Sequence, residues 1–411
     1  MLAFLRVFCY ILSIAYICPL YKDSRKEVRD LNVGLLGYGT VGVGVYEMLR
    51  TAPGLRPGPV LVREGKAREP FQVTAMEAIL SDPSVEAVVE VMGGTEPAFS
   101  CAMAALCSGR HFVTANKALV AAHGLELARA AREHGAAFLF SAACGGGVPL
   151  LHNLSLATQG DEISSVSGIL NGTTNYMLHA MQSRGLDYAG ALKGAQALGY
   201  AEADPTADVS GLDAARKIRL AAAVAFSKLP DGGMDCEGID HISSGDLADF
   251  RSRGLTCRLI ASCAPAGKTV SAFVEPVLFP RGAAECAVGD NLNMARYVGK
   301  NCGPMVLIGQ GAGRWPTASA VIRDLECIRQ GQRTMMPADC AAVTADNRRT
   351  ERSYYVRLRR QDAAALPVAE LLSGGDVVRV RTEKLPVGEM HAAAERIRKN
   401  GGELFFAAME G

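Results

Sequence analysis

The chain has 411 residues, which is long enough for two or three domains that each bury a core. Its 43 Lys and Arg residues nearly balance 42 Asp and Glu residues, which argues against a nucleic-acid partner. The 12 cysteines form no CxxC pair and no Cys/His cluster with zinc spacing. We therefore expect reduced core thiols in a cytoplasmic protein.

Residues 1–30 differ from the rest of the chain and are expected to form an apolar N-terminal extension. The run VFCYILSIAYICPLY (7–21) is nearly long enough for a signal anchor. One basic residue precedes it and four follow closely, so the positive-inside rule would keep the remaining chain in the cytoplasm. A disordered extension and a start-site artefact are the alternatives, and membrane contact is expected only if the run is a genuine anchor.

Residues 31–150 alternate strand and helix patterns, which predicts an α/β domain with a doubly wound parallel sheet. The expected strands are 31–36, 60–63, 86–91, 111–114 and 137–141. Helical stretches are expected at 41–49, 73–80, 97–108 and 125–134.

Residues 151–330 mix helices and strands without regular alternation, which predicts a second, α+β domain. Helices are expected at 152–157, 175–183, 213–226 and 318–329, and strands at 162–170 and 269–277. Residues 331–351 have the composition of a linker. The tail, 352–411, is expected to be a small β-α-β-α-β unit with its first helix in LPVAELL (366–372).

A glycine loop separates the first predicted strand from the first predicted helix. It reads Gly37-Tyr38-Gly39-Thr40-Val41-Gly42. In such a GxGxxG loop the three glycines permit a tight turn, approach to a pyrophosphate and close packing of helix on strand. The helix N-terminus adds N–H donors for the phosphates. A nicotinamide dinucleotide site is therefore predicted, with an ordinary strand–helix turn as the alternative.

The residue that ends the next predicted strand is expected to select the cofactor. An acidic residue there would bind a ribose diol, whereas an arginine accommodates a 2′-phosphate. Arg63 holds this position, and Lys66 and Arg68 follow it. This favours NADP, although the neighbouring Glu64 leaves NAD possible.

The densest group of charged residues lies before and within the helix predicted at 213–226. It comprises Glu202, Asp204, Asp208, Asp213 and Lys217. Asp213 and Lys217 are four residues apart and share a helix face, which by itself could be only a surface ion pair. The carboxylates would also suit a small cationic substrate that carries a hydroxyl group.

A second lysine, Lys117, follows the strand predicted at 111–114. The carboxyl edge of an open α/β sheet is where ligands bind. Two lysines at one site would repel each other, and we expect this repulsion to lower the pKa of one of them. A lysine with a lowered pKa could act as a general base near neutral pH.

Several segments, in order over residues 31–330, resemble homoserine dehydrogenases. They are LLGYGTVG, EVMGGTEPA, HFVTANKALVAAHG, GGGVP, GILNGTTNYML, LGYAEADPTADVSGLDAARK, FVEP and GAGRWPTASAVIRDL. The resemblance implies reversible NAD(P)-dependent hydride transfer between L-homoserine and L-aspartate 4-semialdehyde, and a homodimer formed by the second domain.

The resemblance also implies roles for individual residues. Lys217 would exchange the proton of the substrate's C4 oxygen, and Lys117 would assist beside the nicotinamide. Glu202 and Asp213 would hold the substrate's ammonium group, with Asp208 supporting the lysine. The remaining binding residues would be Gly172 and Thr173 for the substrate, and Gly93, Gly94, Thr95, Gly199 and Gly313 for the cofactor.

Two departures from the family pattern affect these expectations. Ser141 stands where a glutamate is usual before the glycine turn, which weakens a monovalent-cation site built from the carbonyls of Cys144, Gly146 and Val148. The tail resembles an ACT regulatory module, but it is shortened and lacks the usual effector loop, so a plain dimerisation flap is equally compatible.

Two rival functions remain open from the sequence. One is a semialdehyde dehydrogenase with Cys144 as a thiolate nucleophile. The other is a non-catalytic, cofactor-sensing protein built on the same scaffold.

Overall fold

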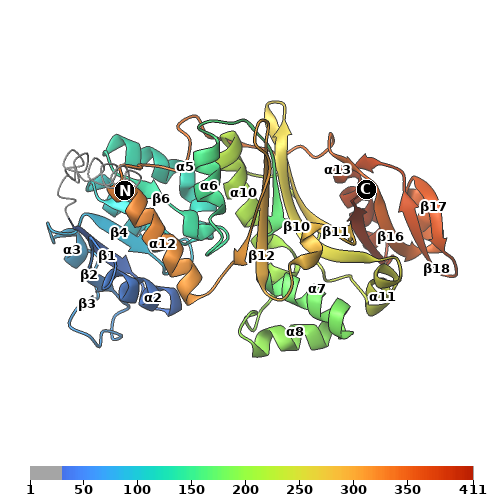
Figure 1. Cartoon of the computed structure of the whole chain (residues 1–411), viewed down its shortest axis with the longest axis horizontal. Helices are drawn as coiled ribbons and strands as arrows, with labels where there is room; N and C mark the ends of the chain where they lie inside the picture. Colours follow the sequence, from blue (N-terminus) through green and yellow to red (C-terminus); the bar gives the residue numbers. More distant parts are fainter. Residues whose placement is uncertain (1–29, 411) are drawn as a thin grey trace, which may run out of the picture.

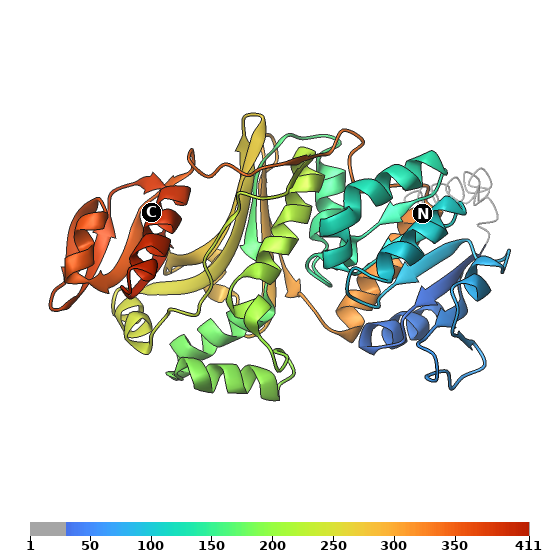
Figure 2. The same cartoon turned by 180° about the vertical axis from the view of Figure 1, so that it is seen from behind.

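The computed structural model describes residues 30–410, so the anchor predicted at 7–21 lies outside the described residues. Three bodies follow one another along the long axis of the molecule: a parallel sheet with its helices, a central sheet and a C-terminal unit (Figure 1). Figure 2 shows helices α7, α8 and α10 on the face of the central sheet that is seen from behind. Within the described part, no helix is long and apolar enough to cross a membrane.

The first sheet is parallel throughout and has the strand order β3-β2-β1-β4-β5-β6. Its strands are β1 (Leu31–Leu36), β2 (Leu55–Leu61), β3 (Gln72–Val73), β4 (Ala87–Glu90), β5 (His111–Thr114) and β6 (Phe138–Leu139). Such a sheet needs apolar residues on both faces of its central strands, and β4 is buried along its whole length. The strand order reverses between β1 and β4, which is where doubly wound sheets bind ligands. The predicted α/β fold is confirmed.

Among the described residues, five helices accompany this sheet. They are α2 (Thr40–Leu49), α3 (Glu77–Leu80), α4 (Ala98–Cys107), α5 (Lys117–Glu133) and α12 (Arg314–Arg329). The last of these returns from much later in the chain to pack beside α2, as Figure 1 shows. Gly44 permits this contact, because a Cβ there would lie 2.7 Å from Cγ of Arg314. Helix α5 begins earlier than predicted because the Asn116 side chain accepts a hydrogen bond from the backbone N–H of Leu119 and so caps the helix.

The central sheet runs β13-β12-β7-β10-β11, with β9 pairing on β11. Its strands are β7 (Ile163–Ile169), β9 (Asp235–Cys236), β10 (Leu255–Ala266), β11 (Thr269–Pro280), β12 (Leu292–Gly299) and β13 (Gly303–Gln310). The helices of this part are α6 (Leu150–Ala157), α7 (Gly172–Arg184), α8 (Tyr188–Ala197), α9 (Thr206–Val209), α10 (Leu212–Phe226) and α11 (Ser244–Ser252). Helix α10 packs on β10 and also contacts α5, so it lies at the border between the two sheets.

The C-terminal unit extends the central sheet. It consists of β16 (Tyr354–Arg359), β17 (Val368–Ser373), β18 (Val377–Thr382), β19 (Leu385–Pro386), α13 (Val387–Lys399) and β20 (Leu404–Met409). Strand β20 pairs in parallel with β11, and the order continues β20-β16-β18-β17. The buried carboxylate of Glu275 in β11 accepts a hydrogen bond from Arg352 at 3.0 Å, which ties the unit to the central sheet.

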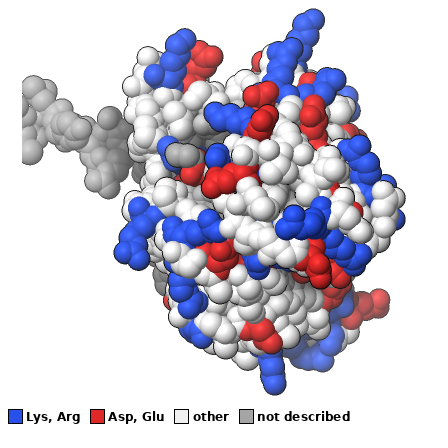
Figure 3. All heavy atoms as spheres, turned by 90° about the vertical axis from the view of Figure 1, so that its right-hand side faces the viewer, with Lys and Arg blue, Asp and Glu red and all other residues white. Residues whose placement is uncertain are grey.

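The helix predicted at 366–372 in this unit is wrong. Residues 368–373 form strand β17, whose pairing with β18 overrides the helix propensity of its Ala, Glu and Leu residues. Between β16 and β17 the chain forms a short 3-10 helix (Arg360–Ala365) and not an α-helix. Lys, Arg, Asp and Glu side chains intermingle on the outer face of this end of the molecule (Figure 3).

The segment expected to be a linker, 331–351, is packed against the rest of the chain. Strand β14 (Ala341–Val343) pairs with β8 (Lys228–Pro230), and β15 (Glu351–Arg352) pairs with β19. The buried Asn347 accepts hydrogen bonds from the Ser271 hydroxyl and the Ala272 N–H, both at 2.8 Å. These contacts hold the segment along the central domain.

Candidate active site

A cleft of about 820 Å³ opens at the carboxyl ends of the first sheet. It is lined by Gly37, Tyr38, Gly39, Leu61, Val62, Arg63, Lys66, Gln72, Thr74, Val91, Met92, Gly93 and Pro97. The glycine loop, the end of β2 and the turn after β4 therefore meet around one cavity, as a dinucleotide site requires. Its size suits a small-molecule cofactor.

Gly37 and Gly42 of the loop have the geometry that the sequence predicts for them. Gly37 has φ +102°, a conformation that a residue with a side chain rarely adopts. A Cβ on Gly42 would lie 2.3 Å from the carbonyl oxygen of Gly37, so only glycine lets α2 pack so closely against the loop. Helix α2 begins at Thr40 and directs the N–H groups of its first turn, including that of Val41, toward the loop.

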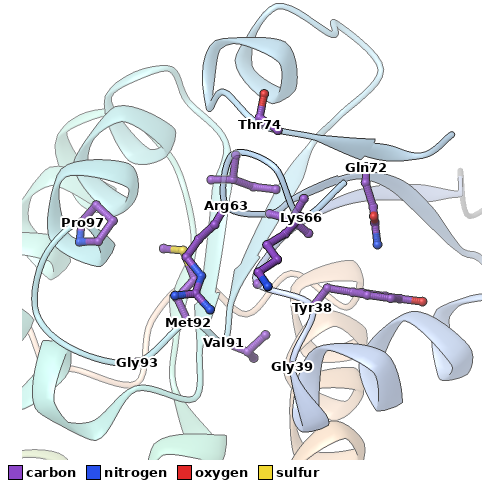
Figure 4. A pocket seen from close by; sticks show the side chains of 13 residues that line it. Tyr38, Gly39, Arg63, Lys66, Gln72, Thr74, Val91, Met92, Gly93 and Pro97 are labelled. Atoms are coloured by element: carbon purple, nitrogen blue, oxygen red, sulfur yellow. The ribbon is translucent and has the colours of Figure 1, made fainter. Parts of the chain in front are cut away.

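Two basic side chains point into the cleft from the segment after β2. Figure 4 shows the Arg63 guanidinium and the Lys66 ammonium group directed toward the space between Gly39 and Gly93. A turn brings them together, since the Lys66 N–H donates to the Arg63 carbonyl at 2.9 Å and Gly65 adopts φ +72°. The described residues that line this cleft include no Asp or Glu.

The carboxylate of Asp213 forms ion pairs with two lysines, Lys117 and Lys217, where α5 meets α10. We call these three residues the triad. Oδ1 of Asp213 is 3.0 Å from Nζ of Lys117, and Oδ2 is 2.7 Å from Nζ of Lys217. Lys117 is the first residue of α5, and Asp213 and Lys217 lie one turn apart on α10. The structure thus brings together residues from both halves of the chain.

The electrostatics of this triad differ from the sequence expectation. Burial opposes the charge of Lys217, but the adjacent Asp213 carboxylate outweighs burial and raises the lysine's pKa above its ordinary value. Burial likewise opposes ionisation of Asp213, but Lys217 and Lys117 hold its pKa below the usual range. The expected lowering of the pKa by lysine–lysine repulsion is therefore wrong for Lys217, because the carboxylate lies between the two ammonium groups.

Asn171 fixes this group, although the sequence reading did not single it out. Its Nδ2 donates to Asp208 at 2.7 Å and to Asp213 at 2.9 Å, while its Oδ1 caps α7 through the Thr174 N–H. Burial raises the pKa of Asp208 despite this hydrogen bond. Nζ of Lys217 also donates to the carbonyl of Leu170 at 2.7 Å, which fixes the direction of the side chain.

The substrate residues expected around this triad lie at the start of α7 and in the loop after α8. Gly172 and Thr173 form the first turn of α7, and the Thr173 hydroxyl donates to the Tyr200 carbonyl at 2.6 Å. Glu202 follows in the same loop with an exposed side chain. Its carboxylate forms no ion pair with any described residue.

Of the other residues expected to bind the cofactor, some lie near the cleft and one does not. Gly94 and Thr95 continue the turn after β4 next to Gly93, which lines the cleft. Gly313 precedes α12 with φ +121°, near the start of the helix that packs on α2. Gly199 adopts φ +73° just after α8 and is not among the residues lining the cleft, so a local helix-ending turn accounts for it.

Cys144 is fully buried next to the triad. Its Sγ lies 3.6 Å from the carbonyl oxygen of Lys217, and burial raises the pKa of its thiol to about 12. A thiol with that pKa is almost entirely protonated at neutral pH and is a poor nucleophile. The geometry disfavours the rival mechanism through a Cys144 thiolate.

Ser141 is bound to a buried acid that the sequence reading missed. The Ser141 N–H donates to Asp324 Oδ2 at 2.8 Å, and its hydroxyl bonds the other carboxylate oxygen. The Val148 carbonyl already accepts a hydrogen bond from Leu150 N–H. No group of three or more His, Cys, Asp or Glu side chains among the described residues could hold a metal ion. A cation bound by the carbonyls of Cys144, Gly146 and Val148 stays a prediction.

Comparisons with known proteins agree with this arrangement. Residues 37–141 match the NAD-binding domain of homoserine dehydrogenase, and residues 149–325 match the homoserine dehydrogenase domain that follows it. A homoserine dehydrogenase of Synechocystis is 41% identical over 313 residues, which cover 72% of each chain. One from Corynebacterium glutamicum is 40% identical over 328 residues, covering 75% of this chain and 74% of the relative.

Solved structures extend the likeness to almost the whole chain. The crystal structure of a homoserine dehydrogenase from Thiobacillus denitrificans has a TM-score of 0.82 and 30% sequence identity, covering 92% of this chain and 98% of the other. These matches do not favour either a semialdehyde dehydrogenase or a non-catalytic cofactor sensor. The chain belongs to the homoserine dehydrogenase family and is an NAD(P)-dependent oxidoreductase that acts on a CH–OH group.

Proposed function

We propose that Lys217 exchanges the proton of the substrate's C4 oxygen in the interconversion of L-homoserine and L-aspartate 4-semialdehyde. The observation that carries this proposal is the bridge in which Asp213 contacts Lys117 and Lys217 at 3.0 and 2.7 Å. When bound, the nicotinamide would supply or accept the hydride at its C4 atom. In semialdehyde reduction Lys217 would donate a proton to the carbonyl oxygen as the carbonyl carbon is reduced, and solvent would then reprotonate the neutral amine.

The raised pKa of Lys217 suits the reductive direction. An ammonium group is ready to donate a proton at neutral pH, whereas homoserine oxidation requires the lysine to lose a proton first. Homoserine oxidation should therefore accelerate toward alkaline pH. Lys117 stabilises the negative charge that develops on the oxygen, since its ammonium group shares Asp213 with Lys217.

Substrate recognition divides between the acidic residues. Both oxygens of Asp213 are engaged by the lysines, and Asn171 also donates to Oδ2, so its main role here is to align the two ammonium groups. The exposed Glu202 is free to hold the ammonium group of the substrate. Asp208 supports the triad through Asn171, and the first turn of α7 offers the N–H groups of Gly172 and Thr173 to the substrate carboxylate.

NADP is the preferred cofactor in this proposal. Arg63 and Lys66 both point into the cleft, where they would pair with a 2′-phosphate. An acidic residue that would bind the ribose diol of NAD is absent from the described lining. Glu64 lies in the same turn with an exposed side chain and leaves NAD as the alternative cofactor.

A homodimer formed through the central sheet is part of the same proposal. Strand β13 is the edge of that sheet, and Met305, Val306 and Ile308 expose 41%, 40% and 52% of their surface there. Apolar residues on an unpaired edge strand favour association with a second chain. Sedimentation analysis should show that the wild type is a dimer and that Ile308→Lys weakens the dimer. A monomeric wild type would exclude the proposed homodimer.

A spectrophotometric assay tests the catalytic proposal. Homoserine-dependent reduction of NADP⁺ is compared for the wild type, Lys217→Ala and Lys300→Ala, the last replacing an exposed lysine that pairs with Glu162. We expect Lys217→Ala to lose about 10²–10⁴-fold in kcat, the usual contribution of general acid–base catalysis, and Lys300→Ala to retain wild-type activity. Wild-type kcat in folded Lys217→Ala would refute the role of Lys217.

A further inference from the structure

A buried carboxylate at the end of β4 hydrogen-bonds both to the turn that lines the cofactor cleft and to Thr114, on the strand that precedes Lys117. Glu90 has no exposed surface. One oxygen accepts hydrogen bonds from the N–H groups of Met92 at 2.6 Å and Gly93 at 3.2 Å, and the other accepts from the Thr114 hydroxyl at 2.6 Å. Glu90 forms no ion pair with another described residue, so these three donors hold its carboxylate in place.

The hydrogen bonds continue from Thr114 to the start of α5. Oγ1 of Thr114 accepts from the Asn116 N–H at 2.9 Å, and Nδ2 of Asn116 donates to the Gly94 carbonyl at 2.5 Å. Oδ1 of Asn116 caps α5 by accepting from the Leu119 N–H at 3.1 Å. Glu90, Thr114 and Asn116 thus close a ring with the Gly93–Gly94 turn, which we call the β4–β5 ring.

Two functional elements depend on this ring. The Gly93 turn lines the cofactor cleft, and Lys117 follows Asn116 directly and reaches across to Asp213. A shift of Thr114 or Asn116 would move both the turn and Lys117, because the hydrogen bonds of the ring are buried or partly buried. Misplacing a catalytic group by about 1 Å costs on the order of a hundredfold in rate.

We propose that Glu90, Thr114 and Asn116 are positioning residues that set the Gly93–Gly94 turn and Lys117 as one unit. They would do so without touching cofactor or substrate. The catalytic part rests on the proposed function of Lys117, whereas the effect on the cofactor turn does not. A purely structural ring would change the stability of the fold and leave catalysis per folded molecule unaltered.

Substitutions at Thr114 separate the two cases. Thr114→Val keeps the shape of the side chain but removes the hydroxyl, whereas Thr114→Ser restores the hydroxyl. Thr382→Val is the matched control: Thr382 is also fully buried on a strand, and its hydroxyl accepts from the Tyr354 N–H at 3.0 Å in the C-terminal unit. Asn116→Ser isolates the link to Gly94, since serine still caps a helix but does not reach Gly94 with an amide.

Two readouts are measured on the purified full-length chain: the Kd of NADPH without substrate, by fluorescence, and kcat and KM for homoserine at saturating NADP⁺. For Thr114→Val and Asn116→Ser we expect about a tenfold or larger rise in the Kd of NADPH and a comparable or larger loss of kcat. Thr114→Ser should stay within about threefold of the wild type, and Thr382→Val should change the melting temperature alone.

The outcomes distinguish this proposal from the proposed function. If Thr114→Val and Thr114→Ser bind NADPH equally tightly, the ring proposal is wrong whatever the turnover. If Thr114→Val loses NADPH affinity but keeps kcat at saturation, the ring positions the turn but not Lys117, which overturns the coupling. A wild type that binds NADPH without oxidising homoserine would refute the proposed function, and the NADPH affinities of the variants would still test the ring's hold on the turn.

Discussion

Lys117 and Asp213 come from different halves of the molecule, yet Nζ of the lysine lies 3.0 Å from Oδ1 of the aspartate. Lys117 begins α5 at the edge of the cofactor-binding sheet, and Asp213 lies in the first turn of α10. The ion pair therefore joins the cofactor-binding sheet's helix α5 to helix α10 of the central domain. Orientation of the two halves and the charge of Lys217 depend on the same carboxylate.

Asp213→Asn tests how the carboxylate controls Lys217. The substitution keeps the shape of the side chain but removes the charge that outweighs burial, so the pKa of Lys217 should fall. The lysine donates a proton only when charged, and the rate of semialdehyde reduction should then decline at a lower pH than in the wild type. We also expect kcat to fall by about a hundredfold, within the range for general acid catalysis.

The pH profile of kcat for semialdehyde reduction measures both effects. Asp231→Asn is the control. The exposed Asp231 pairs with Arg219, which lies on α10, the helix that also carries Asp213. A profile for Asp213→Asn with the wild-type midpoint would show that Asp213 does not set the pKa of the proton donor.

Arg63→Ala tests the cofactor preference. Loss of a charge-assisted hydrogen bond to the 2′-phosphate, worth about 1.5–3 kcal/mol, should raise the Kd of NADPH at least tenfold and leave that of NADH nearly unchanged. Arg68→Ala is the matched control, because the Arg68 side chain donates to the Gly65 and Ala67 carbonyls outside the cleft lining. Calorimetric titration of both cofactors gives the comparison, and equal losses for NADPH and NADH would contradict a phosphate-specific role.

The sequence predicted those features of the site that are local in the chain. The glycine loop has its full pattern within six residues, and Asp213 and Lys217 are one helical turn apart. Contacts between distant residues left no such local pattern. Neither the Lys117–Asp213 pair nor the bond from Asn171 to Asp208 could be predicted from spacing, and the lowered lysine pKa was wrong because the intervening carboxylate was unknown.

Strand pairing explains why the helix predicted at 366–372, the largest error in the predicted fold, does not form. Residues 366–372 have the composition of a helix, but their backbone groups pair with β18, and this long-range pairing determines the structure. For Ser141, the sequence predicts only a departure from the family pattern. Its buried partner, Asp324, lies far along the chain on α12, so no local pattern predicts the hydrogen bonds between them.

Asp324 should make stability depend on pH. It is fully buried, and burial raises its pKa to about 7 even though Ser141 donates two hydrogen bonds to it. Because the unfolded chain releases this proton near pH 4, the unfolded state binds fewer protons between about pH 4 and 7, and stability falls as pH rises through that window. The contribution is about 1.4 kcal/mol per pH unit within it.

Asp324→Asn removes this titration while keeping the side chain's shape. The free energy of unfolding, from urea denaturation at pH 5, 6, 7 and 8, should favour the variant over the wild type increasingly up to about pH 7 and level off above it. A difference between the two proteins that does not vary with pH would exclude Asp324 as the titrating group.

Gly311→Ala should disrupt the joint between the central sheet and α12. A Cβ at this position would lie 2.1 Å from Cγ and Nδ2 of Asn293, whose side chain is buried. Overpacking of this kind costs about 1–3 kcal/mol, and we expect a lower melting temperature and reduced kcat. Gly160→Ala is the control, since a Cβ there meets no atom within 4 Å.

The double variant Gly311→Ala/Asn293→Ala identifies the clash as the cause. Both amide atoms of Asn293 are buried without a hydrogen-bond partner among the described residues, so removing the amide should cost little and make room for the new methyl group. A double-mutant cycle of unfolding free energies should therefore show that Asn293→Ala restores much of the lost stability, with a coupling free energy of about 1 kcal/mol or more. Additive losses would mean that the Gly311 backbone, and not the contact with Asn293, requires glycine.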